Sequence, residues 1–479
     1  MPYAIPIVRA RAGAAIAAAM AGLLASCAAI PKLQPALTAR PSESYAAERS
    51  FVAARSEWPS DQWWTAYGDP QLDRLIDEAL AGSPDLAAAR ARIRKAQALA
   101  GEAAASTLPT LNGNASYQSV RQSYNNGIPA ALVPHGFNDQ GRASLDFAYE
   151  FDFFGKNRAA LAAATSNAKA AEADAAAARL ALSTNVAAAY ADLAQLYADR
   201  DAAEDAVSTR QQSAALIDQR LTNGLESQDA SEAAHSNLAS ARANLRAVDE
   251  SLNLTLNRLA ALLGAGPDRG LAITRPGIAG LKPFGLPADL RADLVGRRPD
   301  VTAARLRAQA AGQGVKQAKA QFYPDINLNA YIGQQSLGLD QFAKSSSLIG
   351  AVGPALRLPI FEGGQLRANY RGAAADYDAA VASYNGVLTQ ALKDVADVAV
   401  SYRALDERLA QSREAFEDSR RAHAITLQRY RGGLATYLEV LTAEDVMISN
   451  QQVLADLQAR AFTLDVALVR ALGGGFHAA

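Results

Sequence analysis

The chain has 479 residues, half of them hydrophobic and a fifth charged, with a formal net charge of −1. This composition is typical of a folded protein and excludes a disordered chain. The balance of charge, without a basic patch or tail, excludes nucleic acid as a partner.

The N-terminus has the pattern of a secretory signal. Arg9 and Arg11 precede an uncharged, alanine-rich run over residues 12–30. A short basic region, an apolar stretch and a small-residue cleavage site predict a signal peptide over residues 1–26. The run is also long enough for a transmembrane anchor, but its alanine content makes it weakly hydrophobic for a stable span. No later segment has the length and hydrophobicity of a transmembrane helix.

The tetrad that ends in Cys27 (Leu-Ala-Ser-Cys) resembles a bacterial lipobox, in which cleavage leaves the cysteine first and the cysteine is then lipidated. Cys27 is the only cysteine, so an internal disulfide is excluded. We expect a covalent lipid there, an S-diacylglycerol and an N-acyl group, whose chains contribute about 0.8 kcal/mol per buried CH₂. Residues 27–60, rich in Pro, Ser and Ala, are predicted to form a lipidated, extended and poorly structured segment.

The main organising feature of the chain is an internal repeat. Residues 84–92 match residues 299–307, at an offset of 299 − 84 = 215. The helix-turn sequence around Gly224 matches the one around Gly433, at an offset of 433 − 224 = 209. The six-residue difference predicts a shorter loop between the strands of the second copy.

Each copy is predicted to form a helix, a strand, a loop, a second strand, a long helix, a turn and a return helix. Residues 264–298, dense in Gly and Pro, form an irregular connection, and residues 474–479 form a tail. The first copy spans 61–263, with helices at 84–107, 156–221 and 227–263 and strands at 111–119 and 142–152. The second spans 299–473, with helices at 299–322, 363–430 and 436–472 and strands at 326–334 and 348–358.

Two smaller helical signals complete the first copy. Asp69 and Pro70 mark the start of an amphipathic helix. In the return helix, leucines recur every seven residues from Leu238 to Leu259, which predicts a coiled-coil seam with a structural role.

The predicted strands each have an apolar and a polar face. In 142–152, Leu145, Phe147 and Phe151 alternate with Asp146 and Glu150. An edge strand on a soluble core would explain one such strand, but this pattern also suits an outer-membrane barrel with water inside. Four strands cannot close a barrel, since the smallest has eight, whereas three chains supply twelve. The pattern therefore predicts a homotrimer in contact with outer-membrane lipid.

Five short motifs of the chain together resemble those of a known family. They are Trp63-Trp64, Gly68-Asp69-Pro70, Arg298-Pro299-Asp300-Val301, Leu358 to Asn369, and Ala471-Leu472-Gly473-Gly474. With these motifs the chain resembles the TolC-like outer-membrane efflux proteins, and within them the lipoprotein (NodT-type) branch that serves RND pumps. The resemblance runs from about residue 58 to 475. It implies a mainly α fold with a small β part, in which two tandem repeats trimerise into a 12-stranded transmembrane β-barrel and a long periplasmic α-helical barrel.

The resemblance also implies site residues. Two helix-turn tips would contact a periplasmic adaptor, and inward-facing acidic residues after the second tip would close the periplasmic mouth. Glu439 matches the first acidic position, whereas the next family acid falls on Thr442, so Glu444 and Asp445 are the substitutes. The barrel–helix junctions fall at Phe154, Gly155, Phe361, Gly363 and Gly364, and the tips at Thr222, Asn223, Gly224, Leu225, Arg431, Gly432, Gly433 and Leu434.

No catalytic or metal site is expected. The four histidines are scattered without ligand spacing, and no phosphate-binding glycine motif precedes a helix. We therefore expect a passive exit duct, not an enzyme, that is coupled to a periplasmic adaptor and an inner-membrane RND-type transporter. Two alternatives are a periplasmic adaptor lipoprotein, which would carry one helical hairpin, and a coiled-coil envelope spacer, which would have no use for one-sided strands.

Overall fold

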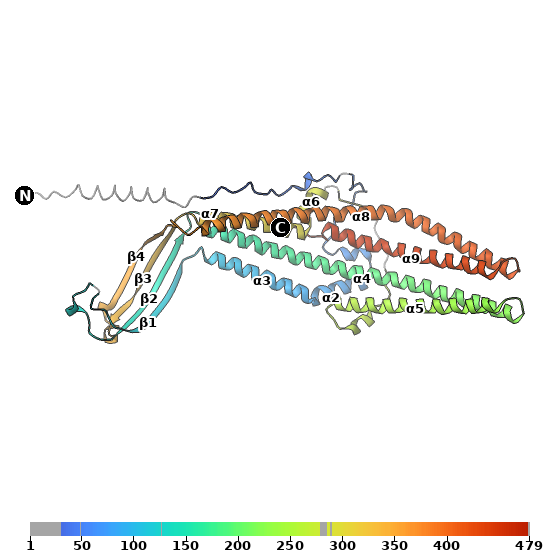
Figure 1. Cartoon of the computed structure of the whole chain (residues 1–479), viewed down its shortest axis with the longest axis horizontal. Helices are drawn as coiled ribbons and strands as arrows, with labels where there is room; N and C mark the ends of the chain where they lie inside the picture. The colour runs from blue at the N-terminus through green and yellow to red at the C-terminus, as the bar shows by residue number, and fades with distance from the viewer. Residues whose placement is uncertain (1–29, 48, 126, 278–284, 288–289, 478–479) are drawn as a thin grey trace, which may run out of the picture. The chain divides into compact units, whose positions relative to one another are not determined.

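The computed structural model describes residues 30–47, 49–125, 127–277, 285–287 and 290–477. The chain divides into two units. Figure 1 labels the helices and strands that form them. Unit 1 contains Met1–Ala39, Arg94–Ala170 and Arg305–Ser383, and unit 2 contains Arg40–Ile93, Ala171–Ala304 and Tyr384–Ala479. Each unit therefore takes segments from both copies of the repeat, and the copies are not separate domains.

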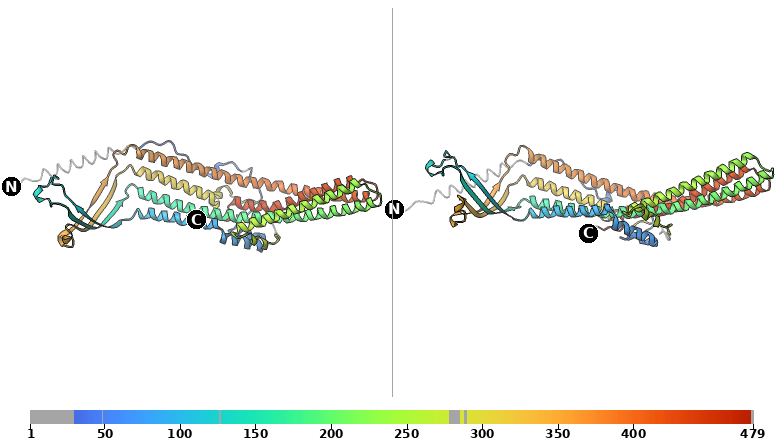
Figure 2. Two further views of the ribbon diagram at one scale, coloured as in Figure 1. Left: turned by 60° about the horizontal axis from the view of Figure 1, so that its bottom comes forward. Right: turned by 90° about the horizontal axis from the view of Figure 1, so that it is seen from below.

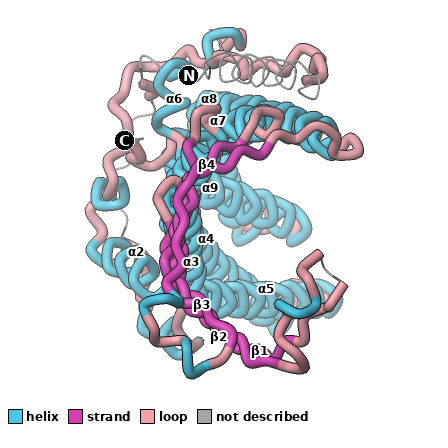
Figure 3. The backbone as a smooth tube through the Cα atoms, turned by 90° about the vertical axis from the view of Figure 1, so that its left-hand side faces the viewer, coloured by secondary structure: helices cyan, strands magenta, loops and turns pink. Residues whose placement is uncertain are grey.

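Unit 1 contains a four-stranded antiparallel sheet in the order β1-β2-β3-β4 (Figure 3). Leu111 pairs with Phe147, and Phe147 pairs in turn with Ala330, so the apolar residues of neighbouring strands share one face. The strands are β1 (Thr110–Val120), β2 (Asn138–Phe151), β3 (Asp325–Leu337) and β4 (Leu348–Arg357). All four lie within a few residues of their predicted positions.

The helices follow the predicted pattern closely. The two long helices each contain 67 residues. The helices are α2 (Pro70–Gly82), α3 (Pro84–Ala105), α4 (Lys156–Thr222), α5 (Gln228–Leu262), α6 (Leu290–Arg297), α7 (Pro299–Ala320), α8 (Gln365–Arg431) and α9 (Tyr437–Leu472). Among the described residues, none of these helices combines the length and the hydrophobicity that a membrane span requires.

The strand pairing confirms both repeat offsets. Thr110 pairs with Ala148, and Asp325 pairs with Arg357. The first partners differ by 325 − 110 = 215 residues and the second by 357 − 148 = 209, the two offsets found in the sequence. The shorter second loop accounts for the difference.

Unit 2 is held by a core that combines aromatic and aliphatic side chains. Asp69 caps α2 by accepting from the backbone N–H of Gln71 at 2.8 Å, as the Asp69-Pro70 signal predicts. Leu72, Ile76 and Tyr190 of this core are fully buried. In the predicted leucine seam, Leu238, Leu252 and Leu259 are buried.

A second core in the same unit contains an ionic contact. Arg298 is 8% exposed, and its guanidinium binds the carboxylates of Asp300 and Asp394 at 2.6 and 3.0 Å. It also donates to the carbonyl of Ala471 at 3.3 Å. The Arg298-Pro299-Asp300 motif therefore fastens the start of α7 to α8 and to the end of α9.

The segment before α2 is extended, but it is packed and not loose. In unit 1, Ile30 and Leu33 pack against a cluster around Phe322 and Tyr370. The Leu37 N–H donates to Asp378 at 2.8 Å. Polar side chains of α8 thus order a segment whose composition predicts little structure.

The connection between the copies is also more regular than its Gly and Pro content predicts. It contains a 3₁₀ helix at Pro267–Ala272 and the helix α6. Leu286 forms a parallel bridge with Arg55 of the preceding segment. Through this bridge the backbone N–H and C=O groups of Leu286 form hydrogen bonds with the segment that precedes α2.

Candidate functional site at the helix-turn tips

The two helix-turn tips have the same backbone geometry. Gly224 and Gly433 have φ angles of +70° and +74°, in the left-handed region that favours glycine. Leu225 N–H donates to the carbonyl of Arg220, and Leu434 N–H to that of Arg429, both at 2.8 Å. This is the Schellman ending of a helix, which satisfies its last carbonyls. Leu225 and Leu434 remain 64% and 72% exposed.

All eight predicted tip residues are exposed at these two turns. Both views of Figure 2 show the α4–α5 and α8–α9 turns side by side within unit 2. An exposed pair of equivalent leucines on two neighbouring turns is a surface that a partner protein can contact.

The buried Tyr430 connects the two tips through a hydrogen bond. The Tyr430 hydroxyl donates to Glu226 Oε2 at 2.6 Å, and the Arg220 guanidinium lies 4.5 Å from the centre of the Tyr430 ring. Burial raises the pKa of Tyr430, and the Glu226 carboxylate adds to this shift. The phenol therefore stays protonated and keeps its role as the donor.

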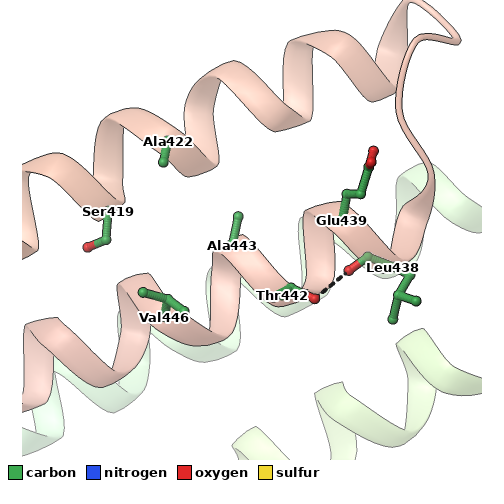
Figure 4. A pocket seen from close by; sticks show the side chains of 7 residues that line it. All are labelled: Ser419, Ala422, Leu438, Glu439, Thr442, Ala443 and Val446. Atoms are coloured by element: carbon green, nitrogen blue, oxygen red, sulfur yellow. Dashed lines mark hydrogen bonds between the residues drawn. The ribbon is translucent and has the colours of Figure 1, made fainter.

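Glu439 takes part in a capping box at the start of α9. Its carboxylate accepts from the Thr436 N–H at 3.0 Å, and Thr436 Oγ1 accepts from the Glu439 N–H at 3.4 Å. The residue is exposed beside a mostly apolar groove of about 490 Å³ between α8 and α9 (Figure 4). The groove is lined by Ser419, Ala422, Leu438, Glu439, Thr442, Ala443 and Val446. Glu439 therefore has a structural role whether or not its charge acts in closure.

The structure places Glu444 away from any surface. Its exposure is 0%, its Oε1 lies 3.2 Å from Arg210 Nε, and its Oε2 accepts from Ser213 Oγ at 3.0 Å. The carboxylate of Glu444 is thus packed between α4 and α9, and its role in closure of the periplasmic mouth stays a prediction. Asp445 is 61% exposed and pairs with the same arginine.

A second acidic pair lies further along α4 and α9. Burial, with the charge of Asp456, raises the pKa of Asp199 to about 6. Asp456 accepts from Gln195 Nε2 at 2.8 Å. The sequence gives no signal for this pair, nor for Arg210 or the Tyr430–Glu226 contact, because each joins residues more than 200 positions apart.

The predicted barrel–helix junctions lie at the ends of β2 and β4. Gly155 has φ +77°, and the consecutive glycines 363 and 364 have φ +58° and +91°. Phe154 stacks on Tyr323 at 4.6 Å, whereas Phe361 is 88% exposed. An exposed aromatic at this position suits contact with lipid. The predicted lipid site, Cys27, lies outside the described residues.

The comparisons with known proteins agree on one class. A family model described as outer membrane efflux protein matches residues 75–265 and 290–474. The crystal structure of the outer membrane protein VceC of Vibrio cholerae is 46% identical, with a TM-score of 0.84 over 88% of this chain and 100% of that chain. The multidrug resistance outer membrane protein MdtP of Escherichia coli K12 is 30% identical over 464 residues, 95% of each chain. The fusaric acid resistance protein FusA of Burkholderia cepacia is 38% identical over 352 residues, 72% of this chain and 66% of that one.

The sheet, the long helices and the paired tips thus define a channel protein of the bacterial outer membrane. The chain belongs to the outer membrane efflux protein family. The family resemblance, the mainly α fold and the role as an efflux channel are confirmed.

Proposed function

We propose that three copies of the chain form a passive exit duct. The observation that carries the proposal is the sheet, whose four strands leave both edges, β1 and β4, unpaired. Three chains supply the strands of a 12-stranded β-barrel in the outer membrane, and their helices supply a periplasmic α-helical barrel. Within the duct no covalent chemistry is needed, and the energy comes from the inner-membrane partner.

The tips are the proposed contact with a periplasmic adaptor of an RND-type transporter. Their support is the matched geometry of Gly224-Leu225 and Gly433-Leu434 and the exposure of both leucines. Relatives named for fusaric acid and multidrug resistance favour small organic compounds as the cargo.

The proposed anchor is a lipid on Cys27, three residues before the docked Ile30. Metabolic labelling with a fatty acid tests it directly. We expect label in the wild-type chain and none in Cys27→Ser, and label retained by the variant would refute this site.

Fractionation and conductance test the duct. We expect an outer-membrane trimer that dissociates on boiling and conducts ions in a planar bilayer. A soluble periplasmic species, or a monomer in the outer membrane, would contradict the proposal.

A further inference from the structure

The charged side chains of the sheet lie mostly on its polar face. The charged residues of the four strands are Asp139, Arg142, Asp146, Glu150, Asp325 and Arg357. Side chains alternate between the two faces along a strand, so Arg142, Asp146 and Glu150 lie together on the face opposite Leu145. By the same alternation Asp139 lies on the apolar face.

The charges of this face that lie nearest the helices are paired with charges of opposite sign. The pairs are Glu150–Lys156 and Asp325–Lys156, at 2.7 and 3.0 Å, and Arg357–Glu362, at 3.7 Å. By contrast, no ion pair in the described part of the chain includes Arg142 or Asp146. A charge without a partner of opposite sign acts on its surroundings over a longer distance than a paired one.

Neutral contacts within the sheet hold Arg142 and Asp146 in place. Asp146 Oδ2 accepts from Asn114 Nδ2 at 2.7 Å and from Ser144 Oγ at 2.8 Å. The guanidinium carbon of Arg142 lies 5.4 Å from the centre of the Tyr331 ring, a cation–π contact. Tyr331 is directly opposite Asp146 on the neighbouring strand, so this contact brings the cation toward the row of the sheet that holds the carboxylate.

We propose that Arg142 and Asp146 form a charge-balanced ring that determines the ion selectivity of the duct at this height. The inference rests on the proposed trimer, in which the polar faces of the sheets enclose water. Each subunit then contributes the Asp146 carboxylate on β2 and the Arg142 guanidinium over β3, so charges of opposite sign alternate around the lumen. A ring with equal numbers of both signs favours neither, and cationic and anionic cargo can both pass it.

The charges of the ring are close enough to the lumen to act on passing ions. At an ionic strength of about 0.1 M the Debye length is about 10 Å, so a charge on the wall acts on an ion beside it. Loss of Arg142 leaves the carboxylates of the ring without their cations, and loss of Asp146 leaves the guanidinium groups without their anions. The two losses should therefore change the selectivity in opposite directions.

Reversal potentials of the full-length protein in planar bilayers, measured across a gradient of KCl, test the ring. We expect Arg142→Gln to raise the permeability ratio of K⁺ to Cl⁻ by about two-fold or more, and Asp146→Asn to lower it by a similar factor. The double variant should return toward the wild-type ratio, because it removes both signs. Migration as a trimer on an unboiled gel shows that each variant has assembled, and either single variant tests the ring because each has its own expected sign.

Matched controls separate the charge from its position and from the shape of the side chain. Asp139→Asn removes a carboxylate from the same strand but from the apolar face, so the permeability ratio should stay at the wild-type value. Arg142→Lys and Asp146→Glu change the shape of the side chain and keep its charge. These two variants should also keep the wild-type ratio.

The outcomes separate this inference from the proposed function. Conducting trimers in which Arg142→Gln and Asp146→Asn shift the ratio in the same direction, or in which either leaves it unchanged, would overturn the ring and leave the duct intact. An equal shift in Asp139→Asn would overturn the ring as well, since the face of the sheet would then not matter. A monomer, or a trimer that does not conduct, would overturn the proposed function, and the inference with it.

Discussion

Arg210 Nε lies 3.2 Å from Oε1 of Glu444, a carboxylate that is fully buried. The contact joins α4 to α9, the two helices that also contribute Ile217 and Val440 to an apolar cluster. A buried ion pair stabilises a fold little compared with apolar packing, but removing one partner is costly. Loss of either partner would therefore leave a buried polar group on α4 or α9 without this contact.

Removal of the two partners should have unequal effects. Arg210→Met leaves Glu444 buried without its cation, so we expect a loss of about 3–5 kcal/mol in the free energy of unfolding. Glu444→Gln keeps a side chain of the same shape beside Ser213 and should cost much less. Thermal unfolding of the solubilised protein at neutral pH measures both, and equal losses in the two variants would contradict this account.

The same contact predicts a dependence on pH. Burial raises the pKa of Glu444, although Arg210 and Ser213 oppose the shift. The folded state therefore holds this proton more tightly than the unfolded state. The protonated Glu444 adds to the free energy of unfolding at low pH, and this contribution is lost as pH rises through the raised pKa. The thermal midpoint of Glu444→Gln should fall less than that of the wild type between about pH 5 and pH 8.

Asp199 should behave in a similar way. Its pKa of about 6 lies above the ordinary value because of burial and the nearby Asp456. As with Glu444, the raised pKa means that protonated Asp199 stabilises the folded state. This contribution to the free energy of unfolding is complete at about pH 4 and lost above pH 6. We expect Asp199→Asn to gain about 1–2 kcal/mol at pH 8, after allowance for solvent screening, and almost nothing at pH 4.

Thermal midpoints across this pH range measure the effect of Asp199→Asn. Asp456→Asn is the matched control, because it keeps Asp199 but removes the neighbouring charge. It should move the pH at which stability declines toward a lower value. A gain in Asp199→Asn that does not change with pH would show that the carboxyl group is not the cause.

The contact between the tips predicts local stability. Tyr430→Phe removes the hydrogen bond to Glu226, which is charged and therefore contributes about 1.5–3 kcal/mol. Amide hydrogen exchange at residues 222–227 and 431–436 should become about ten-fold faster or more, because local opening requires less free energy. Glu226→Gln keeps a weaker acceptor and should give an intermediate rate. Unchanged exchange in both variants would show that the contact does not hold the tips.

The helices, strands and turns that recur in the two copies were predictable from the sequence. Pro, Asn and Gly placed the two copies in register, and the helix ends fall within about two residues of their predicted positions. β2 begins earlier than predicted, at Asn138, because its first residues pair with the end of β1 through backbone groups and carry no apolar alternation. Pairing by the backbone leaves no signal in side-chain pattern.

The contacts between distant segments were not predictable in this way. Glu444 has the sequence surroundings of an exposed helical acid, and its burial is explained by Arg210 and Ser213, which lie on another helix. The order of the segment around Leu37 likewise depends on Asp378 of α8. Such pairs become visible only when the packing of the helices is known.

Glu439 allows a structural role to be separated from a role of its charge. Glu439→Ala removes both the charge and the capping box, whereas Glu439→Gln removes the charge and keeps an acceptor for the Thr436 N–H. If three carboxylates near the axis of the proposed trimer repel one another, both variants should change single-channel conductance and susceptibility to antibiotics. If Glu439 acts only as a cap, Glu439→Ala alone should change them, with a loss of about 0.5–2 kcal/mol that Thr436→Ala reproduces. Wild-type conductance and susceptibility in both variants would exclude Glu439 from the closure of the channel.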